Sequence, residues 1–128
     1  MKLVPFVSVG PTLFSATRDD VVRARGVPRS EVRNDVGLTA LDYGDAVFRF
    51  QDSGRLEEVT LPTPVLHLGV VAVPFARLEA FVETQDAGAF RRAGFLVSPR
   101  FGVAFDPLEP FWVTALARHC LGEWVALR

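Results

Sequence analysis

The sequence predicts an α+β domain with a single antiparallel sheet of about six to eight strands and two helices packed on one face. Short segments of alternating apolar and polar residues indicate strands. Two segments, about 17–26 and 74–85, have helical spacing and helix end signals. A run of strand-like segments follows each of them. The chain therefore reads as two tandem αβββ-like repeats, about 1–64 and 65–128, in one domain, 1–128.

The first predicted helix has both of its ends encoded in the sequence. Thr17 is an N-cap residue, and Asp20, three positions later, completes a capping box. Gly26 fits just past the last turn, and Pro28 prevents the helix from continuing. We therefore expect a short helix over about 17–26.

Strands are expected on both sides of this helix. The segments that read as strands in this half are 2–7, 11–15, 38–43, 46–51 and 56–61. Residues 29–37 show no clear period and read as a loop. The clearest strand is 46–51, where Phe48 and Phe50 share one face while Arg49 and Gln51 take the other.

The second half is predicted to follow the same plan. Residues 65–73 read as one buried strand, Pro74 fits the first helical position, and 86–92 read as loop. Further strands are expected at about 93–98, 101–106, 111–118 and 123–127. Phe105 lies 55 residues after Phe50, and Val113 lies 54 residues after Val59, which aligns the two hairpin patterns.

Composition narrows the function classes. With 14 basic and 15 acidic residues there is no basic excess, so nucleic acid is not expected as a partner. Cys120 is the sole cysteine, which excludes an internal disulfide. No apolar run approaches the roughly 20 residues that span a bilayer, and the first residues lack a signal-peptide pattern. We therefore expect no membrane association and a cytoplasmic location.

No catalytic, cofactor or metal site is expected from the side chains. On a strand, His119 and Cys120 would point to opposite faces, which makes them a poor pair of metal ligands. The serines lack a GxSxG setting, and phosphate-binding glycine motifs are absent from the sequence. An enzyme that uses Cys120 or a histidine, such as His67, remains a further hypothesis.

The sheet face opposite the helices is the predicted interaction surface. If the phenylalanines of 46–51 face the core, Arg49 and Gln51 lie on the other face. Trp112, Thr114 and Leu116 are assigned to that same face. Because tryptophan and arginine are enriched at binding hot spots, we expect Arg49, Gln51, Trp112 and Thr114 to contact a partner protein. The alternative is that Trp112 and Trp124 are both large core residues.

A resemblance supports this expectation. The stretch from Val9 to Val21, continuing to Gly26-Val27-Pro28, combines a short strand, a capped helix start and a helix end in G-x-P. It resembles the small outer-membrane-assembly lipoprotein and beta-lactamase-inhibitor-like superfamily, together with small bacterial proteins presumed to be immunity proteins. The resemblance implies a tandem αβ arrangement whose concave sheet binds a partner protein, and it assigns no functional residue.

The expected function is therefore binding of another protein, in its sharpest form as an intracellular inhibitor or immunity-type protein. The alternative is a small-molecule-binding module whose pocket lies between the helices and the sheet and is lined by Phe and Val with one His. A homodimer formed through sheet edges or faces also stays open.

Overall fold

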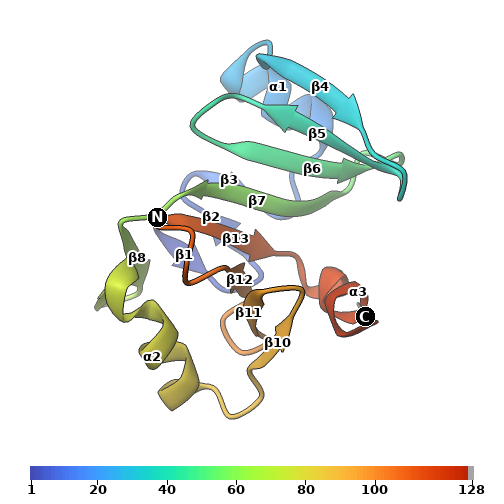
Figure 1. Ribbon diagram of the computed structural model, residues 1–128. Coiled ribbons are helices and arrows are strands. Elements are labelled where there is room, and N and C mark those ends of the chain that lie inside the picture. The colour runs from blue at the N-terminus through green and yellow to red at the C-terminus, as the bar shows by residue number, and fades with distance from the viewer. Residues whose placement is uncertain (127–128) are drawn as a thin grey trace.

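The structure, a computed structural model, describes residues 1–126 of the 128-residue chain. It confirms the α+β class and a main sheet of eight strands. The elements of the first half are β1 (Leu3–Val4), β2 (Ser8–Val9), β3 (Thr12–Leu13), α1 (Arg18–Arg25), β4 (Ser30–Arg33), β5 (Leu38–Asp42), β6 (Val47–Gln51) and β7 (Leu56–Pro62). Figure 1 shows the last four as a meander next to α1.

The second half has a similar order of elements and a helical ending. Its elements are β8 (Val65–Leu68), β9 (Val71–Pro74), α2 (Phe75–Gln85), β10 (Phe90–Arg92), β11 (Phe95–Ser98), β12 (Val103–Phe105), β13 (Trp112–Leu116), the 3-10 helix η1 (Arg118–Cys120) and α3 (Leu121–Ala126). No helix within the described residues is both long enough and apolar enough to cross a membrane.

Two four-stranded meanders join to form the main sheet. Its strand order is β10-β11-β12-β13-β7-β6-β5-β4, with every neighbouring pair antiparallel. The meanders meet where β7 pairs with β13, and Thr60 lies opposite Thr114 there. These two residues are 54 positions apart, the offset at which the sequence aligns Val59 with Val113. Duplication of an ancestral unit stays a prediction.

Helix α1 has the predicted caps. The backbone N–H of Asp20 donates to Thr17 Oγ1 at 3.2 Å, and the N–H of Thr17 donates to Asp20 Oδ2 at 2.9 Å. Gly26 then takes a positive φ of 86° and donates its N–H to the carbonyl of Val22. Its missing side chain makes this backbone conformation accessible.

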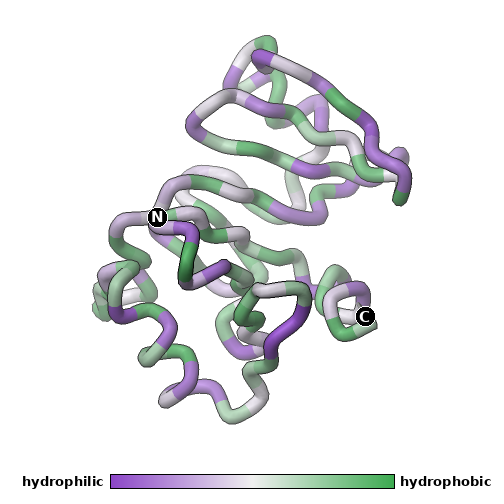
Figure 2. The backbone as a smooth tube through the Cα atoms, in the orientation of Figure 1, coloured by the Kyte–Doolittle hydropathy of each residue, from purple (hydrophilic) through white to green (hydrophobic). Residues whose placement is uncertain are grey.

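One hydrophobic core lies between the sheet and helices α1 and α2. Phe50 and Phe105 are at most 1% exposed and face this core, as their alternation predicted. Val21 of α1 and Leu78 and Val82 of α2 belong to the same cluster of buried residues. Both helices therefore pack on one face of the sheet, and along its strands the hydropathy changes from residue to residue (Figure 2).

Two predicted loops contain the edge strands of the sheet. Within 29–37, Ser30–Arg33 form β4, and within 86–92, Phe90–Arg92 form β10. Both strands lie at the ends of the strand order, and all four residues of β4 are exposed. An edge strand that buries neither face has no alternation to detect, so the loop prediction was wrong for these residues.

The predicted single sheet is also wrong, because five short strands form two further small sheets. Strands β1, β2 and β3 form one of them. The predicted strand 65–73 is a hairpin of β8 and β9, which turns at Gly69 (φ 63°) and the fully exposed Val70. Apart from His67 and Gly69 the residues of 65–73 are apolar, so no polar turn residues separate the two strands in the sequence.

The C-terminal segment is helical where strands were predicted. Strand β13 ends at Leu116, and η1 and α3 follow, so the predicted two-helix total and the strand at 123–127 are wrong over the described residues. Residue 127 lies outside them. Cys120, Leu121 and Trp124 have helical spacing and pack against the face of the sheet opposite α1 and α2.

Candidate functional site

The outer face of the sheet, opposite α1 and α2, is covered by the C-terminal helices over its second half and part of β7. There Val97, Ala104 and Leu116 are buried in a second cluster together with Cys120, and Trp124 packs against them. Leu116 therefore lies on the predicted face but beneath the C-terminal helices. No helix lies over the outer face of β4, β5 and β6 (Figure 1), whereas η1 and α3 contact β7 through His119 and Trp124.

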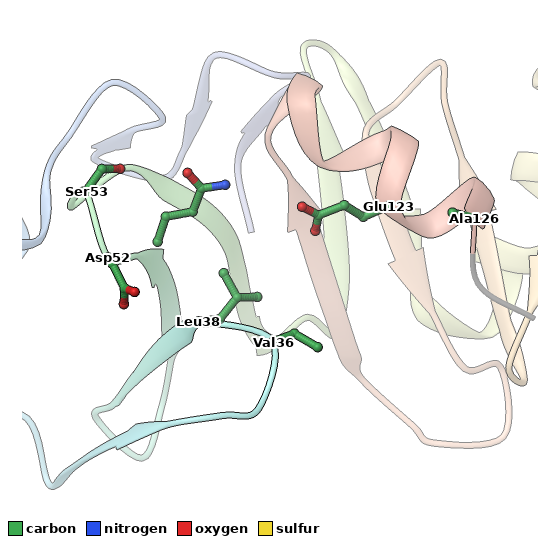
Figure 3. A pocket seen from close by; sticks show the side chains of 8 residues that line it. Val36, Leu38, Asp52, Ser53, Glu123 and Ala126 are labelled. Atoms are coloured by element: carbon green, nitrogen blue, oxygen red, sulfur yellow. The ribbon is translucent and has the colours of Figure 1, made fainter.

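A groove of about 670 Å³ lies between the uncovered half and α3. Its walls are formed by Val36, Gly37, Leu38, Gln51, Asp52 and Ser53 on the sheet side and by Glu123 and Ala126 on α3. Figure 3 shows Val36 and Leu38 across the groove from Glu123 and Ala126. Aliphatic side chains and two carboxylates thus line the groove, without a lysine or arginine among its lining residues.

Asp52 is the carboxylate on the sheet side of this groove. Arg33 donates to both of its oxygens, through Nε at 3.1 Å and Nη2 at 2.9 Å. These hydrogen bonds and the guanidinium charge hold the pKa of Asp52 below its usual range. Among residues 1–126, no ion pair engages Glu123 across the groove. The groove therefore carries negative charge.

A polar chain crosses the junction of the two meanders on the same face. Arg49 Nη1 donates to Thr60 Oγ1 at 2.8 Å, and Thr60 Oγ1 lies 2.8 Å from Thr114 Oγ1. Arg49 Nη1 also lies 3.9 Å from Glu58 Oε1. These contacts fix the guanidinium over β7 and leave its side chain partly exposed.

The four predicted partner-binding residues lie on one face but at two places. Arg49, Trp112 and Thr114 line a hollow of about 230 Å³. Gln51 lies in the larger groove instead. Trp112 is 41% exposed, so it is not a core residue. Their role in binding a partner stays a prediction.

A buried carboxylate, Glu57, was missed by the sequence analysis. Arg49 pairs with Glu58 and Phe50 pairs with Leu56, so Glu57 is the extra residue of a β-bulge in β7. Its side chain is 0% exposed. A bulge changes the direction in which a side chain points, and simple alternation along the strand cannot reveal it.

Glu57 contacts a histidine and an arginine, and its carboxylate oxygens have no hydrogen-bond partner among residues 1–126. His119 Nε2 lies 2.8 Å from Glu57 Oε2, and Arg55 Nη2 lies 3.6 Å from Oε1. Neither contact has hydrogen-bond geometry, and both oxygens lack a hydrogen-bond partner within the described part of the chain. Burial raises the pKa of Glu57, the charges of His119 and Arg55 oppose this rise, and the charge of Glu123 adds to it.

Cys120 and Glu123 lie close to Glu57, and Glu58 contacts Cys120. Ligand atoms of Glu57, Cys120 and Glu123 all lie within 4.8 Å of one another. Glu58 Oε2 accepts a hydrogen bond from Trp124 Nε1 at 2.9 Å and lies 3.6 Å from Cys120 Sγ. Burial and these carboxylates raise the pKa of the Cys120 thiol, so the thiol stays protonated at neutral pH.

The position of His119 and Cys120 in η1 overturns the geometric reason for dismissing them. They lie in a 3-10 helix instead of on a strand, and Cys120 is buried while His119 reaches the surface. His119 contacts the outer side of Glu57, and Cys120 faces the other carboxylates. The only sequence signal was the apolar spacing of residues 120, 121 and 124, which favours a helix.

A second hollow of about 420 Å³ lies next to this cluster. Phe6, Phe14, Arg55, Arg118 and His119 are among its lining residues. The guanidinium of Arg118 stacks over Phe6 at 4.1 Å from the ring centre. Phe6 has a positive φ of 66°, a conformation that is strained for a bulky residue.

Comparison of the chain with protein-family models, with curated proteins and with solved structures found no match.

Proposed function

We propose that this chain binds another protein through the uncovered outer face of β4 to β6 and the groove beside it. The observation that carries the proposal is the groove itself, a concave surface of about 670 Å³ with exposed aliphatic side chains between a bare sheet and a helix. Val32 and Val36, on and just after the edge strand, are 61% and 79% exposed. Contiguous exposed apolar surface is typical of interaction sites.

The partner is expected to present an apolar segment that carries a lysine or arginine. Val36, Leu38 and Ala126 offer apolar contacts, while Asp52 and Glu123 supply the negative charge. Arg33 already compensates Asp52, whereas Glu123 forms no ion pair among residues 1–126. Arg49 and Trp112 extend the surface across the junction of the meanders.

The proposal is tested by comparing three baits in a pull-down from the native lysate. Leu38→Asp places a charge in the groove, and the matched control Val70→Asp places the same charge at a fully exposed turn. We expect one protein to be retained by the wild type and by V70D and to be lost with L38D. Retention should weaken as salt rises, because exposed charges are screened.

Two results would contradict the proposal. One is retention of the same protein by L38D as by the wild type. The other is the absence of any specifically retained protein under several growth conditions. A charge reversal, Glu123→Lys, tests the charge of the partner separately, since it should weaken binding to a basic segment and spare a purely apolar one.

The finer form of the proposal is an inhibitor or immunity-type protein that acts inside the cell. The resemblance of residues 9–28 to proteins with a partner-binding sheet supports this form, as does the shared order of a small sheet, a helix and four strands in the two halves. A tandem duplication would account for that order. The competing possibility is that a second copy of the chain binds the same face to form a homodimer. Light scattering of the isolated protein distinguishes a homodimer from a monomer.

A second candidate function is the binding of a small anionic molecule in the hollow beside His119. The sequence led us to expect a small-molecule pocket between the helices and the sheet. Core side chains, including Phe48 and Phe105, occupy that space instead. The observation that favours the other hollow is the convergence of Arg55, Arg118 and His119 on its walls. Thermal shifts with small phosphates and carboxylates test it, and R118A should abolish any stabilisation that they produce.

A further inference from the structure

Three side chains from β7 and the C-terminal helices converge, two of them buried and the third exposed. Glu57 comes from the bulge in β7, Cys120 from the end of η1 and Glu123 from the first turn of α3. One ligand atom of each lies within 4.8 Å of the other two. Donor atoms on one tetrahedral zinc ion lie roughly 3.3–3.8 Å apart, given metal–ligand distances of about 2.0–2.3 Å. Closing the gap requires the donor atoms to approach one another by roughly 1–1.5 Å at most.

The carboxylate of Glu57 gives an independent reason to look for a ligand there. It is 0% exposed, and neither oxygen has a hydrogen-bond partner among residues 1–126. A buried polar group without hydrogen bonds is destabilising. His119 and Arg55 offset part of its charge from the outer side. On the inner side it faces Cys120 and Glu123, which are electron-pair donors and offer it no cation.

We infer that Glu57, Cys120 and Glu123 form a binding site for a zinc-like divalent metal ion, which would join the C-terminal helices to the sheet. A thiolate combined with carboxylates favours zinc over magnesium or calcium, because sulfur is a soft ligand. His119, 2.8 Å from Glu57 on the opposite side, is a positioning residue that orients the carboxylate. Water supplies the remaining coordination position.

Metal binding at this site has a defined proton balance. Only the thiolate binds the metal, so the thiol proton must be released to the buffer on binding. Binding should therefore weaken as pH falls. Calorimetry in buffers with different ionisation enthalpies should report at least one released proton.

The test uses the reduced full chain in chelator-treated buffer, titrated with zinc and then with cobalt(II) as a spectroscopic probe. We expect one zinc ion per chain and, with cobalt, the charge-transfer absorption that a thiolate ligand produces. Cys120→Ser should abolish that absorption. Glu123→Gln should weaken zinc binding by about tenfold or more, on the scale of losses at metal sites, and keep the absorption.

Controls separate this site from incidental binding and from misfolding. Glu123 is exposed, so E123Q leaves the core intact, and circular dichroism of each variant verifies its fold. Glu79→Gln removes a carboxylate on α2, far from the cluster, and should leave zinc affinity unchanged. The inference is overturned if the wild type binds no zinc at micromolar concentration. It is equally overturned if folded C120S and E123Q bind zinc as tightly as the wild type.

Discussion

The two halves of the sheet differ on their outer face and agree on their inner one. On the inner face, Phe50 of the first meander and Phe105 of the second are buried in the same core. On the outer face, Leu116 is fully buried under the C-terminal helices, whereas Val32 is 61% exposed. A single short segment, residues 118–126, makes this difference. Which part of the sheet is free to bind a partner therefore depends on the helices that cover it, and the strands alone do not determine this.

The largest effect on stability is expected on the inner face of the sheet, where the two halves agree. Phe50→Ala and Phe105→Ala should each lower the free energy of unfolding by about 3–5 kcal/mol, the usual cost of removing a buried phenyl ring. Chemical denaturation measures this. Similar losses are expected for the two variants because both rings belong to one core. A loss of less than about 1 kcal/mol for one of them would show that its half contributes little to that core.

The next effect tests the difference between the outer faces. Leu116→Ala, beneath η1 and α3, should destabilise the protein by about 2–5 kcal/mol. Val32→Ala, on the uncovered half, should change stability by no more than about 0.5 kcal/mol. Denaturation curves of the two variants provide the comparison. Equal losses would mean that the outer face of the first half is also covered in solution.

A smaller effect is expected at the junction of the two halves. Thr60→Val and Thr114→Val each remove one hydroxyl from the polar chain that Arg49 begins. Each change should cost about 1 kcal/mol, the usual net contribution of a hydrogen bond. A double-mutant cycle should give a coupling of about 0.5–1.5 kcal/mol. Additive losses would contradict the hydroxyl contact.

The smallest effect is on the pH dependence of stability, and it compares Asp86 in the second half with Asp52 in the first. Burial by itself would raise the pKa of Asp86, but hydrogen bonds from Ser98 Oγ and from the N–H groups of Arg100 and Gly88 hold it below its usual range. A carboxyl whose native pKa is lowered stabilises the fold above its unfolded pKa, and this contribution is lost as pH falls through the native value.

Measurements of the free energy of unfolding from neutral to acidic pH test this contribution of Asp86. Asp86→Asn should flatten the acid-induced loss of stability. Asp52→Asn should change it less, and the small effect should disappear in high salt, since the Asp52–Arg33 pair is exposed. Identical acid profiles for wild type and D86N would contradict the assignment.

Local signals were sufficient for α1 and for the inner face of the sheet. The capping box of Thr17 and Asp20 and the alternation around Phe48 and Phe50 each depend on residues close together in sequence. The edge strands and the C-terminal helix were missed because β4 buries neither face and α3 is short. Their structure depends on neighbours that the sequence does not place beside them.

The candidate sites were predictable only in part. The outward direction of Arg49 and Gln51 followed from alternation, but the groove beside Gln51 depends on α3, which was expected to be a strand. Glu57 was assigned to an ordinary alternating strand. One inserted residue in β7 changed the direction of its side chain and brought it close to Cys120, and the spacing of charges cannot indicate such an insertion.

The pairing of Thr60 with Thr114 has a consequence for how the chain folds. Within each meander, neighbouring strands are joined by short connections, whereas this pairing joins strands 54 residues apart. Closing a longer loop costs more chain entropy, and contacts distant in sequence slow folding. We therefore expect each meander to form first and the pairing of β7 with β13 to limit the rate at which the native sheet is completed.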